Sequence, residues 1–539
     1  MRNKPNNLVR FLFAAIALMA SEVTIAQENL PTDYLSKEFH AARREAFRKL
    51  MPDNSVAVIF AYPERVFSRD VNYVYHANPD LYYLSGYKEP DAVLIIFKEN
   101  QNKGEHSYNE IMYARKRNPE REVWDGRRLG VEGVKKQLGF TMVYNSDEFA
   151  QAPIDFSTFS KVLYDEIPDD IAAGTLQTAM KSFMEKAKIK PVESRSTMQA
   201  YNMIANYTTP SNLSNRVARI KSMMAESQDE EFKNNPLILE LLNKPDSATL
   251  ASVSQKIKAN PFPTQAYNTI ISTLREIKTP EELALLRKSV FISSIAHAEV
   301  MKAITPNMSE MELAGLLEYV HRKYGAEDEG YPPIVGAGAN GCILHYEENT
   351  MTLVKNQLVL MDVGSEYHGY SADVTRTTPA NGKFTAEQKA IYQIVYDAQE
   401  EVFKLCKDGT PYGQLEEKTL EVLSNGLIKL GIIKDKKEVR KYYMHGVSHH
   451  MGLDVHDKFA TRTLKENMVI TVEPGIYIPK GSPCDPKWWD IGVRIEDDVV
   501  IGKNGCENLS AAAPRKVEDV EKMAAKKSAF NEMTFPALK

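Results

Sequence analysis

The chain has 539 residues, a formal net charge of −5, and a composition of 43% hydrophobic and 26% charged residues. These fractions are ordinary for a soluble globular protein and exclude a chain that is disordered or membrane-embedded over most of its length. The negative net charge argues against nucleic acid as a partner, because nucleic-acid binding needs a basic surface. One hydrophobic core rarely serves more than about 300 residues, so we expect two or three domains.

The first 26 residues have the layout of a cleavable signal peptide. Arg2, Lys4 and Arg10 precede an apolar run over residues 11–20, and small residues follow up to Ala26. The run is about half the ~20 residues that a membrane-spanning helix needs, so no stable membrane anchor is expected. We predict cleavage near Ala26 and an exported protein, periplasmic or secreted.

Changes in hydrophobic pattern divide the rest of the chain into four segments. Residues 27–219 alternate apolar strand-like runs with amphipathic stretches, which predicts an α/β domain. Residues 220–270 are polar and interrupted by proline, and we expect a helical insertion or linker there. Residues 271–510 are predicted to form an α+β domain, followed by a mostly polar tail over residues 511–539.

The α+β domain should open with a long helix. Thr279 can cap this helix, Pro280 suits its first position, and Glu282 completes a capping box, so the helix should run toward Ala303. Further elements are predicted as glycine-punctuated strands over 334–378, helices over 385–407 and 413–430, and strands over 468–478 and 491–501.

The four cysteines are too few for a disulfide framework and lack the spacing of a metal motif. Export would permit one bridge, for which Cys484 and Cys506 are the best pair. Buried free thiols are the favoured interpretation.

Two aspartates in the segment 358–376 are spaced for shared chemistry. The segment is predicted to form a hairpin, and a turn centred on Tyr367 and His368 would place Asp362 opposite Asp373. Facing carboxylates about 5 Å apart repel unless a proton or a cation lies between them. Two unrelated surface aspartates near a turn remain the alternative on this segment alone.

Later motifs favour the cation. Four of the eleven histidines lie within residues 445–456, and histidine is the commonest nitrogen ligand for transition metals. Glu473 is a lone acid in an apolar strand, and Arg494 and Glu496 share one face of the next strand by two-residue alternation. Buried charges of this kind need compensation, which metal ions supply.

One imidazole and four carboxylates suit two divalent ions. The candidate ligands are Asp362, Asp373, His449, Glu473 and Glu496. A site rich in oxygen favours manganese, with cobalt, iron and zinc left open. Paired ions about 3.5–4 Å apart can share a hydroxide and polarise a carbonyl, so the predicted chemistry is hydrolysis of an amide.

These motifs, in this order, resemble the pita-bread metallopeptidases, and the whole chain is similar to the Xaa-Pro aminopeptidases (aminopeptidase P). The resemblance covers residues 34–523 except for 220–262. In the C-terminal half it rests on residues 341–346, the segment of Asp362 and Asp373, and residues 445–449, 454–457, 473–477 and 494–498; in the N-terminal half it rests on 80–87 and 124–130.

The resemblance implies a pita-bread catalytic domain after a creatinase/prolidase-like α/β domain. It also implies release of the N-terminal residue from peptides with proline second, by a metal-bridged hydroxide. By the same resemblance, Asp362 would chelate one metal, and Asp373 and Glu496 would bridge both. His449 and Glu473 would complete the other, with Glu473 taking the proton from the bridging water.

Further roles are implied for residues around these ligands. His445 and His456 would contact substrate around the scissile carbonyl, and His345 would line the same pocket. Tyr477 and Arg494 match positions that orient ligands and relay protons. Trp124 resembles a residue that can reach the active site of a neighbouring subunit, so a homo-oligomer, a dimer or a tetramer, is expected.

The chain departs from the family pattern beside the substrate pocket. Lys458 and Phe459 follow His456-Asp457, where relatives often carry His-Asp-Val-Gly, and Tyr331-Pro332-Pro333 is an unusual lead-in to the strand after it. Two alternatives stay open: a prolidase, which cleaves only Xaa-Pro dipeptides, and a pita-bread module that binds peptides without cleaving them. The second would lack metal ligands, and this chain has the complete set.

Overall fold

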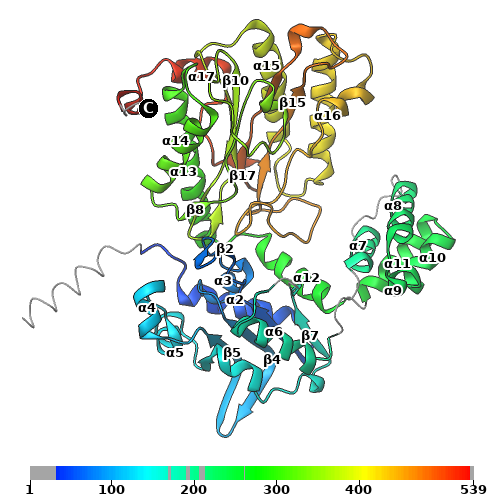
Figure 1. Ribbon diagram of the computed structural model, residues 1–539. Coiled ribbons are helices and arrows are strands. Elements are labelled where there is room, and N and C mark those ends of the chain that lie inside the picture. The colour runs from blue at the N-terminus through cyan, green and yellow to red at the C-terminus, as the bar shows by residue number, and fades with distance from the viewer. Residues whose placement is uncertain (1–31, 168–170, 190–194, 206–212, 260–261, 534–539) are drawn as a thin grey trace, which may run out of the picture. The chain divides into compact units, whose positions relative to one another are not determined.

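The computed structural model describes residues 32–167, 171–189, 195–205, 213–259 and 262–533 (Figure 1). The predicted signal peptide, residues 1–26, lies outside the described residues. Residues 1–36 form a separate unit from residues 37–539, and the fold below is that of the second unit. Among the described residues, no helix has the length and apolar character needed to cross a membrane.

The N-terminal domain is built on a five-stranded mixed sheet in the order β6-β5-β4-β1-β7. Its strands are β1 (Ser55–Phe60), β4 (Val93–Lys103), β5 (His106–Ala114), β6 (Val143–Asn145) and β7 (Lys161–Tyr164). Strand β1 is buried throughout, pairing antiparallel with β4 and parallel with β7. Helix α6 (Thr175–Lys186) buries Met180 and Phe183 against one sheet face, as expected of an α/β domain.

The N-terminal domain has further elements outside this sheet. They are α2 (Lys37–Leu50), β2 (Val66–Ser68), β3 (Val71–Asn72), α3 (Pro79–Ser85), α4 (Pro119–Asp125) and α5 (Gly130–Gly133). Helix α3 is capped by Asn78, whose side-chain oxygen accepts hydrogen bonds from two backbone amides, and all seven residues of the helix are buried.

A helical segment follows the sheet and begins earlier than predicted. Its helices are α7 (Arg195–Ala205), α8 (Leu213–Glu226), α9 (Glu230–Lys233), α10 (Pro236–Asn243) and α11 (Ser247–Ala259). Ile204 on α7 and Ile220 on α8 share one apolar core with Phe232, Leu241 and Val253. This common core places the start of the segment at α7 instead of residue 220.

The predicted end of the insertion at residue 270 also differs from the structure. Helix α12 (Pro263–Arg275) packs against α2 and β7, and the rings of Tyr267 and Phe47 lie 5.9 Å apart. Most of α12 is therefore part of the N-terminal domain.

The C-terminal domain consists of short antiparallel sheets between pairs of helices. Its helices are α13 (Pro280–Ala303), α14 (Glu310–Lys323), α15 (Ala386–Phe403), α16 (Gly413–Lys429) and α17 (Val517–Ala524). Its strands are β8 (Asp328–Glu329), β9 (Ile334–Ala337), β10 (Leu358–Val363), β11 (Ser365–Tyr367), β12 (Tyr370–Ser371), β13 (Val374–Pro379), β14 (Val469–Val472), β15 (Gly475–Ile478), β16 (Ile491–Arg494), β17 (Asp497–Ile501) and β18 (Cys506–Asn508).

The two largest apolar cores of this domain lie between its helices and its strands. Residues of α13 and α14, among them Val300 and Leu317, pack on Val359 of β10. On the other side, Val395 of α15 and Leu423 of α16 share a core with strands β15 and β16. Helices thus flank the sheets on both sides, as Figure 1 shows around β10, and the predicted α+β class is confirmed.

The local helix signals of this domain are confirmed. Thr279 accepts a hydrogen bond from the amide of Glu282 at 3.3 Å, and Glu282 accepts one from the amide of Thr279 at 2.9 Å. The helix ends at Ala303, as expected. The later predicted helices appear as α15 and α16, with α15 ending four residues early.

Both long strands predicted near the C-terminus are broken at the acidic residues. The first divides into β14 and β15 at Glu473-Pro474, and the second into β16 and β17 around Glu496. Pro474 has no N–H to give to a ladder, and the amide of Glu473 donates to the carbonyl of Val447 instead. The breaks turn Glu473 and Glu496 out of regular strand pairing.

The predicted hairpin register is wrong by two residues. Asp362 pairs with Thr375, and the turn lies at His368 and Gly369, both with positive φ, as a two-residue hairpin turn requires. Since side chains alternate with period two, a shift of two leaves Asp373 on the same face as Asp362, diagonally instead of directly across.

The segment predicted as a mostly polar tail contains a packed helix within its described residues. Helix α17 buries Val517 and Val520, and it contacts α13 and α15. The four cysteines are free thiols, so the alternative bridge between Cys484 and Cys506 is not formed.

We predict that Thr279→Ala lowers the thermal unfolding midpoint of the C-terminal domain by about 2–4 °C, because losing a cap costs about 1 kcal/mol. Differential scanning calorimetry measures this shift. Thr279→Ser keeps the capping oxygen and should unfold close to the wild type. An equal loss in both variants would contradict the cap assignment.

Candidate metal centre

Tyr331 joins the two aspartates of the hairpin. Asp362 lies in β10 and Asp373 just before β13, and the Tyr331 hydroxyl lies 2.6 Å from Oδ1 of each. The backbone here is tightly packed: a Cβ on Gly364 would stand 1.7 Å from the carbonyl oxygen of Ala372, so only glycine fits. Both carboxylates are buried and held within reach of one small ligand.

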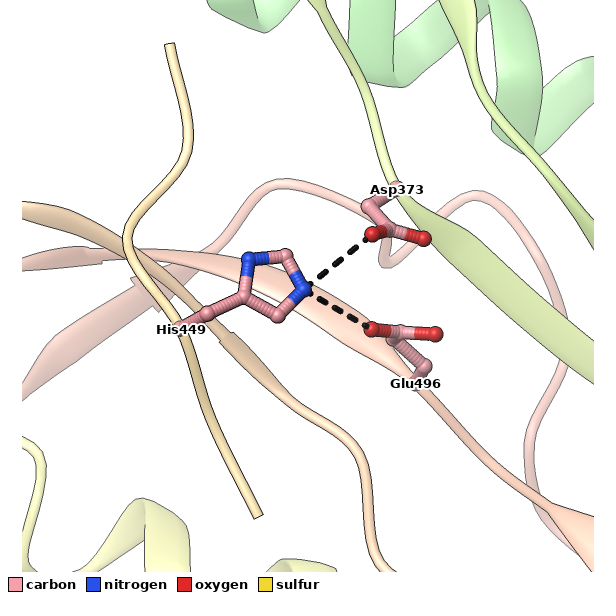
Figure 2. Close-up of side chains that lie close together, drawn as sticks. All are labelled: Asp373, His449 and Glu496. Carbon is pink, nitrogen blue, oxygen red and sulfur yellow. Dashed lines mark ion pairs between the residues drawn. The ribbon is translucent and has the colours of Figure 1, made fainter. Parts of the chain in front are cut away.

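His449 lies beside Asp373 and Glu496 (Figure 2). Its Nε2 lies 3.3 Å from Oδ2 of Asp373 and 4.0 Å from Oε1 of Glu496, and one ligand atom from each of these three residues lies within 4.8 Å of the others. Oε1 of Glu473 is 3.7 Å from the same nitrogen. The predicted ligands Asp362, Asp373, His449, Glu473 and Glu496 therefore converge, although they come from four separate segments.

The orientation of the His449 ring suits a metal ligand. Its Nδ1 lies 3.1 Å from the carbonyl oxygen of His450, and a carbonyl can only accept, so Nδ1 carries a proton. In the neutral ring, the lone pair of Nε2 then faces the carboxylates. Histidine ligands to metals usually have this arrangement, with the second nitrogen held by a hydrogen bond.

Burial and neighbouring acids shift the pKa values of the residues in this cluster. Burial raises the pKa of Asp362 to about 6, against the opposing effect of Arg494. Burial and the neighbouring acids Asp373 and Glu473 raise the pKa of Glu496 well above its usual value. Burial would lower the pKa of His449, but Asp373 and Glu473 outweigh it and raise this pKa to about 9. Protons take the place of cations here, so the donor set fits divalent ions.

A second chain of contacts runs from Asp362 to His445. Arg494 donates to Oδ2 of Asp362 at 2.5 Å and to the Tyr477 hydroxyl at 2.9 Å. The Tyr477 hydroxyl lies 2.8 Å from Nε2 of His445. Burial raises the pKa of Tyr477, so its hydroxyl keeps its proton and can donate to His445.

The remaining predicted residues occupy different surroundings. The ring of His456 lies 4.2 Å from that of His449, edge to face, and burial lowers the pKa of His456. His345 is exposed on the loop after β9 and is near enough to affect His456 electrostatically. Trp124, on α4, is 84% exposed, and its contact with a second subunit stays a prediction.

Sequence reasoning missed three side chains that hold the ligands. Besides Tyr331, Thr375 donates to Glu496 at 2.7 Å, and Asp498 accepts from the amide of Asp373 at 3.0 Å. Thr375 lies two residues after Asp373 and Asp498 two after Glu496, so each shares a strand face with a ligand. That spacing could have indicated Thr375 and Asp498 from the sequence. The unusual Tyr331-Pro332-Pro333 segment could have indicated Tyr331.

Profiles of two protein families match the chain, one in each half. Residues 284–503 match the sequence profile of "Metallopeptidase family M24". Residues 40–161 match that of "Aminopeptidase P, N-terminal domain".

The similarity extends over nearly the full length of individual relatives. "Xaa-Pro aminopeptidase" of Escherichia coli (strain K12) is 32% identical over 502 residues, covering 90% of this chain and 97% of that protein. "Intermediate cleaving peptidase 55, mitochondrial" of Arabidopsis thaliana is 27% identical, covering 93% and 86%. The solved structure of aminopeptidase P from E. coli with the inhibitor Pro-Leu matches with a TM-score of 0.69 at 31% identity, covering 91% of this chain and 98% of that one.

We predict that Mn²⁺ binding to the metal-free protein at pH 7 releases protons. His449, with a pKa of about 9, is protonated at pH 7, and the raised pKa of Glu496 favours its protonated form, whereas ligands must lose their protons to bind a metal. Affinity should therefore weaken as the pH falls. Titration calorimetry in two buffers of different ionisation enthalpy measures the release, and a binding heat independent of the buffer would contradict it.

Proposed function

Because the chain belongs to the aminopeptidase P family of metallopeptidases, we propose that it hydrolyses the N-terminal residue from peptides whose second residue is proline. The observation that carries the proposal is the convergence of Asp362, Asp373, His449, Glu473 and Glu496 at one site in a chain that matches such an enzyme over 91% of its length. A binding module without activity would not need this donor set.

We propose that these five residues hold two divalent ions, with manganese favoured by the four carboxylates. Asp362 would hold one ion, Asp373 and Glu496 both, and His449 with Glu473 the other. When bound, the ions would polarise the scissile carbonyl and lower the pKa of the attacking water. Tyr331 supports this assignment, because its hydroxyl keeps Asp362 and Asp373 at a common distance.

We propose that Glu473 accepts the proton of the attacking water. Its Oε1 is 3.5 Å from the Thr471 hydroxyl, while its Oε2 is 3.3 Å from Nδ1 of His445. The strand break at Pro474 directs this carboxylate toward the other predicted ligands, beside His445 and His449. A proton accepted by Glu473 would have a path to the leaving amine at the same site.

His445 and His456 would lie beside the reacting carbonyl. His445 is oriented from both sides, since its Nδ1 lies 2.8 Å from the carbonyl of Gly446 and its Nε2 2.8 Å from Tyr477. Arg494 holds Tyr477 in turn. His456 is held near the cluster by its contact with the ring of His449, where it can donate to developing negative charge.

We predict that the metal-loaded enzyme cleaves a tripeptide Xaa-Pro-Yaa and leaves a dipeptide Xaa-Pro largely intact. The same fold and ligands serve prolidases, so only substrate length separates these two functions. Liquid chromatography of the products measures both reactions. Rapid turnover of the dipeptide with none of the tripeptide would establish the prolidase alternative.

We predict that Asp373→Asn abolishes most activity and metal binding. Asp373 contacts both Tyr331 and His449, and loss of a residue that merely orients a ligand already costs about 10–100-fold. Steady-state rates and metal content of the dialysed protein measure the effect. Asp397→Asn, an exposed acid on α15, is the matched control and should keep both. Full hydrolysis by Asp373→Asn, or by chelated wild type, would defeat the metal mechanism.

A further inference from the structure

His456 lies on a loop that has no secondary structure of its own. Residues 451–459, called here the His456 loop, contain neither helix nor strand. Backbone hydrogen bonds fix the start of the loop, from the amide of Met451 to the carbonyl of Val469 at 3.2 Å and from that of Ser371 to Gly452 at 2.8 Å. Two more close the loop on itself, from the amide of Gly452 to the carbonyl of Asp454 at 3.0 Å and from that of Asp457 to His450 at 2.8 Å. From residue 453 to residue 459, the position of the loop relative to neighbouring elements therefore depends on side-chain contacts.

Charged side chains beside His456 supply those contacts. Arg275, the last residue of α12, is 1% exposed and donates to Asp454 at 2.6 Å and also to Asp457. Its other terminal nitrogen donates to Oδ1 of Asp80 on α3 at 2.6 Å. Lys278 donates to Asp457 at 2.8 Å. Through Arg275, the loop is tied to a helix of the N-terminal domain.

Lys458 makes the same connection directly. Its Nζ donates to Oδ2 of Asp80 at 2.7 Å and to Asn268 at 3.1 Å, and it lies 3.5 Å from Asp165. Both oxygens of Asp80 are thus engaged, one by Arg275 and one by Lys458. Burial would raise the pKa of Asp80, but these two cations outweigh it and lower the pKa, so the carboxylate is charged.

Acids outnumber cations around Lys458, so the loss of its charge would leave one carboxylate oxygen without its cation. Arg275, Lys278 and Lys458 face four acids, Asp80, Asp165, Asp454 and Asp457. Without Lys458, Oδ2 of Asp80 would keep only the Tyr267 hydroxyl at 3.1 Å. Lys458 is also a position where the chain departs from the His-Asp-Val-Gly pattern of relatives, and valine could not form this ion pair.

We propose that Lys458 is a positioning residue that fixes the His456 loop to Asp80, so that the N-terminal domain sets the place of His456 in catalysis. The inference rests on the proposed function for its kinetic consequence only. Lys458 does not contact the metal ligands, and its effect passes through two peptide units to His456. The ionic contact holds His456 in place, as strand β10 does for the predicted ligand Asp362.

The test compares Lys458→Met with wild type on a tripeptide Xaa-Pro-Yaa. We expect kcat to fall roughly tenfold and KM to stay within about twofold, because a displaced catalytic group slows the reaction more than it weakens binding. Lys458→Arg should restore the rate by restoring the charge. Lys383→Met, which removes a surface ion pair of 2.9 Å with Glu521, is the matched control and should match the wild type.

A second measurement does not depend on the substrate. Hydrogen–deuterium exchange of the metal-free protein should be faster over residues 451–459 in Lys458→Met and unchanged there in Lys383→Met. Lys458→Gln serves in the same way if the methionine variant fails to fold. Unchanged exchange, or a lower melting temperature with wild-type kcat, would overturn the inference. An inactive wild type would instead overturn the proposed function, while the exchange result still decides on the loop.

Discussion

Mutual repulsion among four carboxylates, three of them buried and one partly buried, is the constraint on which the C-terminal domain depends. Two like charges about 4 Å apart repel by about 4 kcal/mol at the effective dielectric of a partly buried site. Asp362, Asp373, Glu473 and Glu496 together would therefore offset much of the ~5–15 kcal/mol by which a domain is stable. Arg494 and His449 relieve only part of this repulsion. The raised pKa values of Asp362 and Glu496 are the consequence in the metal-free protein, and divalent ions relieve the repulsion when bound.

The strands are interrupted where this site is built. Pro474 ends β14 beside Glu473, a break precedes β17 beside Glu496, and Gly364 allows close approach of the chain before Asp373. Regular strands would send neighbouring side chains to opposite faces, whereas each break turns one acid toward His449. The rigid parts of the sheets and the two apolar cores then hold the acids in place against their repulsion.

Positions around the ligands are set by polar contacts from distant segments. Tyr331 spans two ligands, Thr375 holds Glu496, and Arg494 connects Asp362 to Tyr477 and so to His445. The His456 loop is a different case, because its ionic contacts reach Asp80 on α3. The two domains thereby share one cluster of charges next to the site.

Local signals were sufficient for much of what the sequence determined. The capping box at Thr279, the periodic helices α15 and α16, and the acids and histidines of the site could all be identified from neighbouring residues, because capping and amphipathic patterns act over a few positions. Even the hairpin face of Asp362 and Asp373 was correct, since an error of two residues preserves the alternation of side chains. The family resemblance added the implied roles of these residues and the implied substrate.

Tertiary structure decided what depends on contacts between distant segments. The turn at His368 and Gly369 set the true register, and the shared core of α7 to α11 set the boundary of the helical segment. The hydroxyl of Tyr331 and the ammonium of Lys458 reach partners 31 to 378 positions away in sequence, so no local pattern could reveal them. A sequence names the charged groups, but only the folded chain decides which of them lie close enough to need a cation, because electrostatic energy depends on distance and burial.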